Sequence, residues 1–338
     1  MVDFSEILCY SSVRKLTLGG FFMKQTIWIP LLILGGLLIL IGILALAIPR
    51  FLFHYLFSAP KRSTKIPDYY IGTPHYKVSQ AGLKVMKSME YQDASIISRD
   101  GLKLHAYLFP AGEEPPKKFV IGVHGYRSYS RPEYAPYIEF YHSLGYSMLL
   151  PDDRAHRPSE GDYVGFGVLD RLDCVDWAKY LVKTYGEDIE ILLHGVSMGG
   201  ATVCAASGEA DLPAQVKGII SDCAFSNAWD VLHYQLREVV HLPADLILPA
   251  VEKVCQKKAG FNFHDYSAQE QVTQARVPML FVQGEKDSMV PAHMAQVLYD
   301  ACGSEKKRLL LVPEAGHGES IAFAPEQYHQ LIRELFGI

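Results

Sequence analysis

The sequence predicts an α/β protein with a mostly parallel central sheet, helices on both faces and a small helical cap, preceded by one N-terminal transmembrane helix. From Phe119 onward, short apolar runs alternate with helical periods, which is typical of strand–helix–strand units. Upstream, the stretch 26–48 carries no charge. It is as long as a helix that crosses a hydrocarbon core of about 30 Å.

Composition narrows the class of protein. The 338 residues are 49% apolar and 20% charged, as in a packed globular chain. The net charge is -5 and the basic residues are scattered, so we expect no nucleic-acid partner. The six cysteines form no C-x-x-C pair and no zinc-like spacing with histidine. We therefore expect buried free thiols and no metal site.

The apolar stretch 26–48 is flanked by Lys24 and Arg50. A cleaved signal peptide is the alternative, because Ala45-Leu46-Ala47 has the form of a cleavage site. However, the apolar region of a signal peptide reaches only about 15 residues. The length therefore favours an uncleaved anchor that spans the cell membrane once.

The start of the chain has a second candidate at Met23. Met23-Lys24-Gln25 before the apolar run resembles the beginning of a bacterial export signal, so our hypothesis is that residues 1–22 are not translated. An N-terminal peptide from that stretch, found by mass spectrometry, would refute it. Basic residues on both sides of the span leave its orientation undecided. A start at Met23 would leave a short tail in the cytoplasm and the folded domain outside.

The chain divides into a tail, an anchor, a tether and one globular domain, which we place at 1–25, 26–48, 49–90 and 91–338. The domain opens with a hairpin around Asp100-Gly101, a favourable turn dipeptide. The alternation of later runs predicts the following elements: strands at 94–98, 102–109, 119–123, 146–150, 189–194, 216–221, 279–283 and 308–312, and helices at 81–89, 133–144, 168–185, 198–207 and 326–336.

Between about 225 and 267 this alternation stops and helical stretches intervene at 229–240 and 244–257. An insertion at this point would lie above the carboxyl ends of the strands, where ligands bind in open α/β sheets. We interpret it as a small helical cap.

Gly195-Val196-Ser197-Met198-Gly199 stands directly between a predicted strand and a predicted helix. Glycines at Gly195 and Gly199 permit the tight turn that exposes a serine hydroxyl at the positive end of a helix. Ser197 is therefore the candidate nucleophile.

A serine hydroxyl needs a base to remove its proton, and the base needs an acid to orient it. Asp287 lies in a polar loop after a strand, and His317 lies between two glycines after the last strand. Their order after the serine fits this kind of site. Glu285 is the rival acid in the loop of Asp287, and ordinary loop carboxylates are the alternative for both.

An oxyanion forms when the serine attacks an acyl carbonyl, and a pair of N–H donors is needed to stabilise it. The backbone N–H of Met198 is one by construction, and the loop Val123-His124-Gly125-Tyr126-Arg127 should supply the other from Tyr126. We interpret His124 as a structural brace.

These motifs, with Gly284-Glu285-Lys286-Asp287 and Gly316-His317-Gly318, resemble the α/β-hydrolase superfamily, in particular its bacterial membrane-anchored serine hydrolases. The resemblance covers about residues 90–338. It implies a Ser-His-Asp triad, hydrolysis of an ester, thioester or amide, no cofactor, and an extracytoplasmic domain. The stretch 152–161 resembles the family's D-x-R-G-H-G-x-S-x-G loop, but Ala155 and Arg157 replace two glycines. Arg154 is expected to brace that loop through Asp152 or Asp153.

The expected substrate is a small ester or a short acylated peptide. We expect carboxylesterase or lipase-like action, and the second candidate is a peptidase that cleaves short or acylated peptides. A catalytically silent, membrane-tethered binding protein is the alternative from another class. Side chains expected at the pocket, or else simply holding the cap and loops, are Tyr129, Arg157, Phe225, Trp229 and Tyr234.

Overall fold

The computed structural model describes residues 5–60, 65–112 and 114–338, so residues 1–4 of the expected tail lie outside the described part. The chain forms two units, the first ending at Leu52 and the second running from Phe53 to Ile338.

The first unit consists of one helix, α1 (Ser5–Phe57), whose last residues belong to the second unit. Its stretch Trp28–Phe57 contains an 18-residue window with a mean hydropathy of 3.1 and is long and apolar enough to cross a membrane. Apolar side chains such as Leu32 and Ile39 are exposed along it. A helix that is apolar all round is typical of a membrane span. The helix also covers most of the expected tail, since it begins at Ser5.

The second unit is built on an eight-stranded sheet of order β1-β2-β4-β3-β5-β6-β7-β8. The first two strands form the predicted hairpin, which pairs antiparallel with β4, and the remaining pairings are parallel. The turn at Gly101 has φ 90°, which glycine adopts without strain. The strands are β1 (Gln92–Ile97), β2 (Lys103–Phe109), β3 (Lys118–Val123), β4 (Ser147–Asp152), β5 (Glu190–Val196), β6 (Val216–Asp222), β7 (Met279–Gly284) and β8 (Lys307–Val312).

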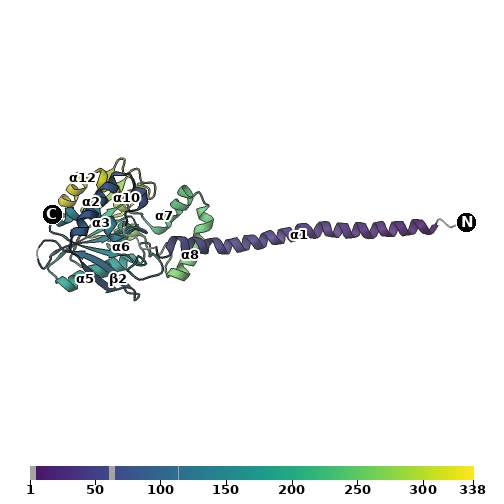
Figure 1. The fold of residues 1–338 in the computed structure, drawn as a ribbon, viewed down its shortest axis with the longest axis horizontal. Helices are drawn as coiled ribbons and strands as arrows, with labels where there is room; N and C mark the ends of the chain where they lie inside the picture. Colours follow the sequence, from purple (N-terminus) through teal and green to yellow (C-terminus); the bar gives the residue numbers. More distant parts are fainter. Residues whose placement is uncertain (1–4, 61–64, 113) are drawn as a thin grey trace. The chain divides into compact units, whose positions relative to one another are not determined.

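Helices cover both faces of this sheet (Figure 1). An apolar core packs α2, α4 and α12 against one face, while α5, α6 and α9 pack together on the other. The helices of the unit are α2 (Pro74–Ser88), α3 (Ser130–Tyr134), α4 (Ile138–Ser143), α5 (Asp170–Tyr185), α6 (Met198–Ala206), α7 (Ala228–Tyr234), α8 (Ala244–Ala259), α9 (Ala268–Val272), α10 (His293–Ala301), α11 (Ser320–Phe323) and α12 (Pro325–Phe336), with short turns η1 (Asp68–Tyr70), η2 (Ala135–Tyr137) and η3 (Gln235–Val239).

The insertion between β6 and β7 is helical, as the sequence predicts. Its main elements are α7, the π-helical turn η3 and α8. Because it follows the carboxyl end of β6, it is attached at the edge of the sheet where the candidate residues gather.

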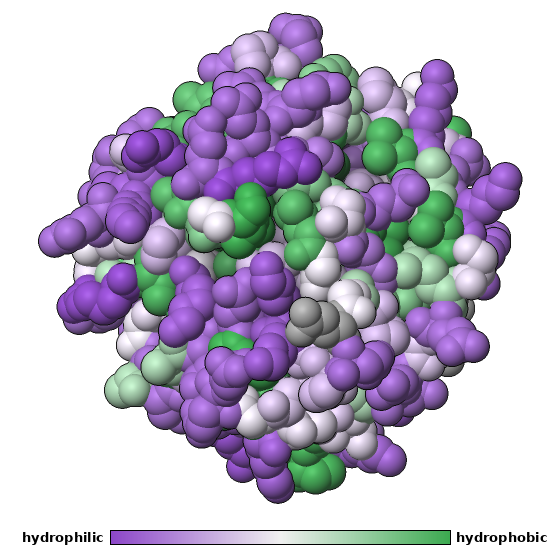
Figure 2. Space-filling model, turned by 90° about the vertical axis from the view of Figure 1, so that its left-hand side faces the viewer, coloured by the Kyte–Doolittle hydropathy of each residue, from purple (hydrophilic) through white to green (hydrophobic). Residues whose placement is uncertain are grey.

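The surface and the thiols are ordinary for a folded domain. On the face shown in Figure 2, hydrophilic side chains predominate and apolar ones lie in small separate patches. The free cysteines of the described part, Cys174, Cys204, Cys223, Cys255 and Cys302, are buried. This agrees with the expectation of buried thiols without a disulfide framework.

The end of α1 is part of the domain, whereas the sequence suggested a tether there. Phe53 and Phe57 are fully buried, and the Phe57 ring stacks on Phe263 with centroids 5.5 Å apart. Backbone hydrogen bonds from Val164 N to Phe57 O (2.8 Å) and from Ala59 N to the carbonyl of Asp162 (2.9 Å) extend this attachment. The domain therefore begins about forty residues earlier than its predicted start at 91.

The helix expected at 81–89 begins earlier as well. The Thr73 hydroxyl caps α2 by accepting from Tyr76 N, and Pro74 occupies the first helical position. Both are favourable helix-start signals. The apolar period near Ala81 marked only the later half of this helix.

Candidate active site

Ser197 lies in a sharp turn between β5 and α6. Its backbone has φ 58° and ψ -116°, a conformation that costs a side-chain-bearing residue about 1–3 kcal/mol. A Cβ on Gly195 would lie 2.0 Å from the carbonyl oxygen of Gly199, and one on Gly199 would lie 1.9 Å from that of Val123. Only glycine fits at either position, which explains why the turn needs both.

The structure brings Ser197, His317 and Asp287 together from loops that follow β5, β8 and β7. The Ser197 Oγ lies 2.9 Å from His317 Nε2, and His317 Nδ1 lies 2.7 Å from Asp287 Oδ2. The rival Glu285 is exposed, whereas Asp287 is buried and in contact with His317. The three side chains thus form a continuous hydrogen-bonded relay.

Asp287 is fixed by three further donors. The backbone N–H groups of Met289 and Val290 donate to Oδ1 at 2.8 and 2.9 Å, and the Gln283 amide donates to Oδ2 at 2.9 Å. These bonds stabilise the carboxylate charge and leave Oδ2 aimed at His317. Gln283 was not predicted, although a polar residue at the end of the apolar strand β7 is a usable signal.

His317 is partly buried and lies next to several carboxyl groups. Burial alone would lower the pKa of its imidazole, but the charge of Asp287 and their hydrogen bond, with smaller contributions from Glu133 and Asp222, raise the pKa above its ordinary value. The Tyr70 hydroxyl donates to the backbone carbonyl of His317 at 3.0 Å. Tyr70 was also missed, because it lies in a segment without a clear periodic pattern.

The loop after β3 lies against the serine. A Cβ on Gly125 would be 3.3 Å from the Cβ of Ser197, so the backbone that leads to Tyr126 passes close to the nucleophile. The buried His124 braces this loop: its Nε2 accepts from Asp153 N at 3.0 Å, and its Nδ1 lies 2.8 Å from Gly125 O. Burial lowers the pKa of His124, which suits a neutral brace. Met198 is the first residue of α6, next to the serine.

The expected pocket residues separate into two groups. Tyr129 and Phe225 are buried, and Phe225 stacks on Phe166 with centroids 5.3 Å apart. Phe166 in turn contacts Tyr126 edge to face at 5.6 Å. This places an aromatic surface beside the candidate oxyanion loop, and Phe166 had not been predicted.

Trp229 and Tyr234 line a hollow of about 390 Å³ on the cap with His293 and Met294, and Ser197 is not among its lining residues. Trp229 also lines a second hollow of about 370 Å³. Arg157 is exposed on its loop. These three side chains therefore lie on the surface, and no contact in the described part joins them to the relay.

Cys223, Asp287 and His317 offer ligand atoms that all lie within 4.8 Å of one another. A metal would require a cysteine thiolate, but burial raises the pKa of the Cys223 thiol well above its usual range. The facing atoms of Asp287 and His317 are already bonded to each other. The group therefore fits a relay better than a metal site.

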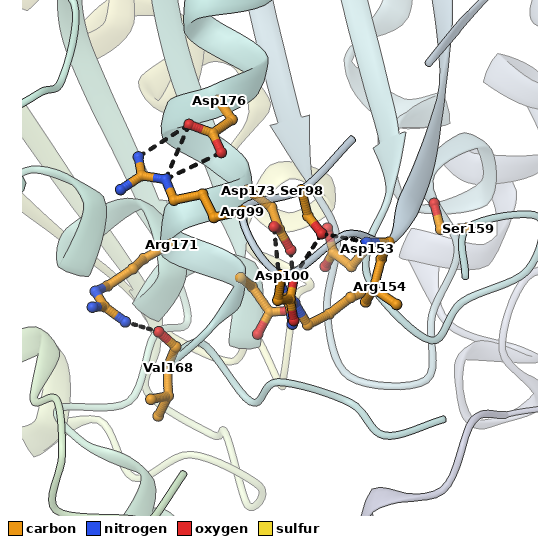
Figure 3. A network of polar contacts seen from close by, with 12 residues as sticks. Ser98, Arg99, Asp100, Asp153, Arg154, Ser159, Val168, Arg171, Asp173 and Asp176 are labelled. Carbon is orange, nitrogen blue, oxygen red and sulfur yellow. Dashed lines mark hydrogen bonds and ion pairs between the residues drawn. The ribbon is translucent and has the colours of Figure 1, made fainter. Parts of the chain in front are cut away.

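The loop 152–161 has Ala155 and Arg157 at the two glycine positions, and Figure 3 shows the polar contacts around its Arg154. Ala155 takes φ 65° and its N–H donates to Glu160 O at 2.9 Å. The partners expected for Arg154 were wrong: it pairs with Asp173 at 2.7 Å and with Asp100 at 2.9 Å.

The two aspartates expected to pair with Arg154 are engaged elsewhere. Asp152 accepts from the Ser130 hydroxyl at 2.9 Å, and Asp153 faces His124 Nδ1 at 3.7 Å. Arg154 therefore joins the loop to α5 and to the hairpin turn instead of closing the loop on itself.

A mostly parallel sheet with serine, aspartate and histidine at the ends of its strands defines the α/β-hydrolase class. The chain belongs to the prolyl oligopeptidase family of this class, whose model matches residues 167–335, half of the chain.

Two curated relatives match at low identity. The uncharacterized protein YqkD of Bacillus subtilis is 26% identical over 202 residues, which cover 59% of this chain and 64% of that protein. The uncharacterized membrane protein YNL320W of Saccharomyces cerevisiae is 26% identical over 199 residues, 58% of this chain and 62% of that protein. The chain thus spans slightly less than two thirds of each relative.

Solved structures agree on the fold. The Pyrococcus furiosus esterase Pf2001 superposes with a TM-score of 0.61 at 22% identity. The match covers 83% of this chain and 96% of the esterase chain. Est1E from Butyrivibrio proteoclasticus, determined with bound ferulic acid, gives a TM-score of 0.51 at 18% identity, with 74% and 100% coverage.

Replacing Arg154 should destabilise the domain. Arg154→Met leaves Asp173 buried without its cation, so we expect the free energy of unfolding to fall by about 3–5 kcal/mol. Arg99→Met is the matched control, because Arg99 pairs with Asp176 at the surface, where an ion pair contributes at most about 1 kcal/mol. Urea unfolding of the purified proteins measures both, and equal losses would contradict the structural role of Arg154.

Proposed function

We propose that the protein is a serine hydrolase that cleaves carboxylic esters, or thioesters or amides, through an acyl-enzyme intermediate. The observation that carries the proposal is the relay from Ser197 Oγ to His317 Nε2 (2.9 Å) and from His317 Nδ1 to Asp287 (2.7 Å). A serine hydroxyl aligned in this way with an imidazole and a buried carboxylate is the arrangement that acyl transfer requires.

In the proposed mechanism His317 takes the Ser197 proton as the oxygen attacks the acyl carbon. The N–H groups of Met198 and Tyr126 stabilise the oxyanion, and His317 passes the proton to the leaving alcohol. Water, deprotonated by His317, then attacks the acyl enzyme and releases the acid and free Ser197. Asp287 keeps the imidazole in the tautomer that presents a free Nε2 to serine.

An ester is favoured over a peptide by the apolar surface next to the candidate oxyanion loop. Tyr126, Phe166 and Phe225 pack together there, and such apolar surroundings suit an acyl group better than the polar backbone of a peptide. A peptidase that acts on short or acylated peptides is the second candidate, and the match to the prolyl oligopeptidase family supports it.

The apolar helix supports membrane anchoring, and one relative is described as a membrane protein. We propose a single-pass anchor in the cell membrane with the hydrolase domain on the extracytoplasmic side, because Met23-Lys24-Gln25 before the apolar run resembles the beginning of a bacterial export signal. Protease added to sealed cells should then digest the domain. Protection of the domain until the membrane is opened would overturn this orientation.

A fluorophosphonate probe tests the nucleophile. We expect the wild-type protein in membranes to be labelled and to hydrolyse p-nitrophenyl esters, and Ser197→Ala to lose both, because the probe reacts with an activated serine hydroxyl. Ser143→Ala is the control, since the Ser143 hydroxyl only bonds the carbonyl of Phe140. Absence of labelling in folded wild-type protein would favour the silent binding protein instead.

The dependence of kcat/KM on pH tests Asp287 as the acid that orients His317. His317 must be neutral to act as base, so kcat/KM should fall as the pH drops through its raised pKa, above pH 6.5. Asp287→Asn removes the main cause of that rise, so the acidic limb should move to lower pH, and kcat should drop by about 10⁴. Glu285→Gln, an exposed change in the same loop, should alter neither. An acidic limb that stays in place in Asp287→Asn would rule out the assigned partner.

A further inference from the structure

We infer that the substrates are long-chain acyl esters of bilayer lipids, which the hydrolase attacks at the membrane surface. This inference rests on the proposed function and adds the class of substrate. It follows from the contacts between the end of α1, just after the apolar span, and the candidate oxyanion loop.

Two consecutive residues of that loop donate hydrogen bonds to the last turn of α1. The Tyr126 hydroxyl donates to the carbonyl of Leu56 at 2.5 Å, and the Arg127 guanidinium donates to the carbonyl of Tyr55. The guanidinium also lies over the rings of Tyr55 and Tyr126, 5.6 and 5.3 Å from their centroids. The loop next to Ser197 is thus fastened to the segment that leaves the span.

Aromatic rings continue this attachment toward the nucleophile. The buried Phe57 contacts Phe166 with centroids 5.6 Å apart, and Phe166 contacts both Tyr126 and Phe225. These rings, of which Phe57, Phe166 and Phe225 are buried, form one apolar cluster between the end of α1 and the loop that borders the serine. The cluster therefore fixes that loop to the end of α1.

Chain connectivity limits how far the site can lie from the membrane. Arg50 is the first charged residue after the apolar run, and Leu56 follows six residues later. Six residues reach at most about 20 Å even when fully extended, whatever the orientation of the two units. The polar layer of each leaflet is itself about 5–8 Å thick. Tyr55 and Leu56, which bind Arg127 and Tyr126, therefore lie no more than about 20 Å from the end of the apolar run, so the candidate oxyanion loop stays near the membrane surface.

A flexible tether would serve an enzyme that acts on soluble esters equally well. Residues 53–59 are instead fixed to the domain by buried rings and backbone hydrogen bonds. Withdrawing an acyl chain into water costs free energy for every methylene exposed. A site fixed near the surface avoids that cost, whereas for a soluble substrate its position would bring no benefit.

The experiment moves the domain away from the bilayer without altering it. A 20-residue (EAAAK)₄ spacer between Arg50 and Phe51 adds about 30 Å where helical and leaves residues 53–59 in place. The full-length protein and this variant are reconstituted in phosphatidylcholine vesicles that contain a fluorogenic diacyl lipid. The same spacer inserted between the exposed residues Glu187 and Asp188 is the control for insertion itself.

We expect the anchor spacer to lower hydrolysis of the vesicle lipid at least about ten-fold, because the effective concentration of lipid at the site falls. Hydrolysis of soluble p-nitrophenyl butyrate should change less than about two-fold in both variants, since insertion far from Ser197 leaves the site intact. Dispersing the lipid in detergent should restore its hydrolysis by the anchor-spacer variant.

Two results would overturn the inference while leaving the proposed function intact. One is equal cleavage of vesicle lipid with and without the anchor spacer. The other is an unmodified protein that cleaves p-nitrophenyl butyrate, or an S-acylated peptide in the same vesicles, but no lipid ester. If the unmodified protein cleaved no ester and took up no fluorophosphonate, the proposed function itself would fail.

Discussion

The turn at Ser197 is the constraint on which the site depends. Its φ of 58° is held by the close approach of three backbone segments, because Gly195 meets Gly199 and Gly199 meets Val123 at distances that exclude any Cβ. The Ser197 N–H also donates to Asp222 O at the end of β6. The strained turn is therefore stabilised by β3, β5 and β6 together, and the rigid sheet fixes the direction of the hydroxyl.

The charges around His317 are arranged so that one carboxylate is its partner. Asp222 and Glu133 are buried nearby, and burial raises the pKa of both, that of Asp222 to about 7. The Tyr328 hydroxyl donates to Asp222 at 3.0 Å, so this carboxyl group has a partner outside the relay. Asp287 instead accepts hydrogen bonds from two backbone N–H groups and an amide, which fix its carboxylate against His317.

The sequence was sufficient to predict the sheet and the relay because both follow local rules. Short segments of the sequence contain the signals for both: the periods of strands and helices, and the glycines around Ser197 and His317. The partners of Arg154 were not predictable in this way, since Asp173 and Asp100 lie on different elements that meet only in the folded chain. The same holds for Tyr70 and Phe166, whose contacts join segments far apart in sequence.

The segment after the apolar span was misjudged for a further physical reason. Phe53 and Phe57 are four residues apart on α1, so they share one face of the helix, and that face is buried in the domain. In sequence, the same aromatic residues also suit a membrane interface. Hydropathy cannot distinguish a ring that meets lipid from one that meets protein, because both surroundings are apolar. Only the contacts of Phe57 with Phe166 and Phe263 distinguish them, and they make the end of the anchor a structural part of the domain.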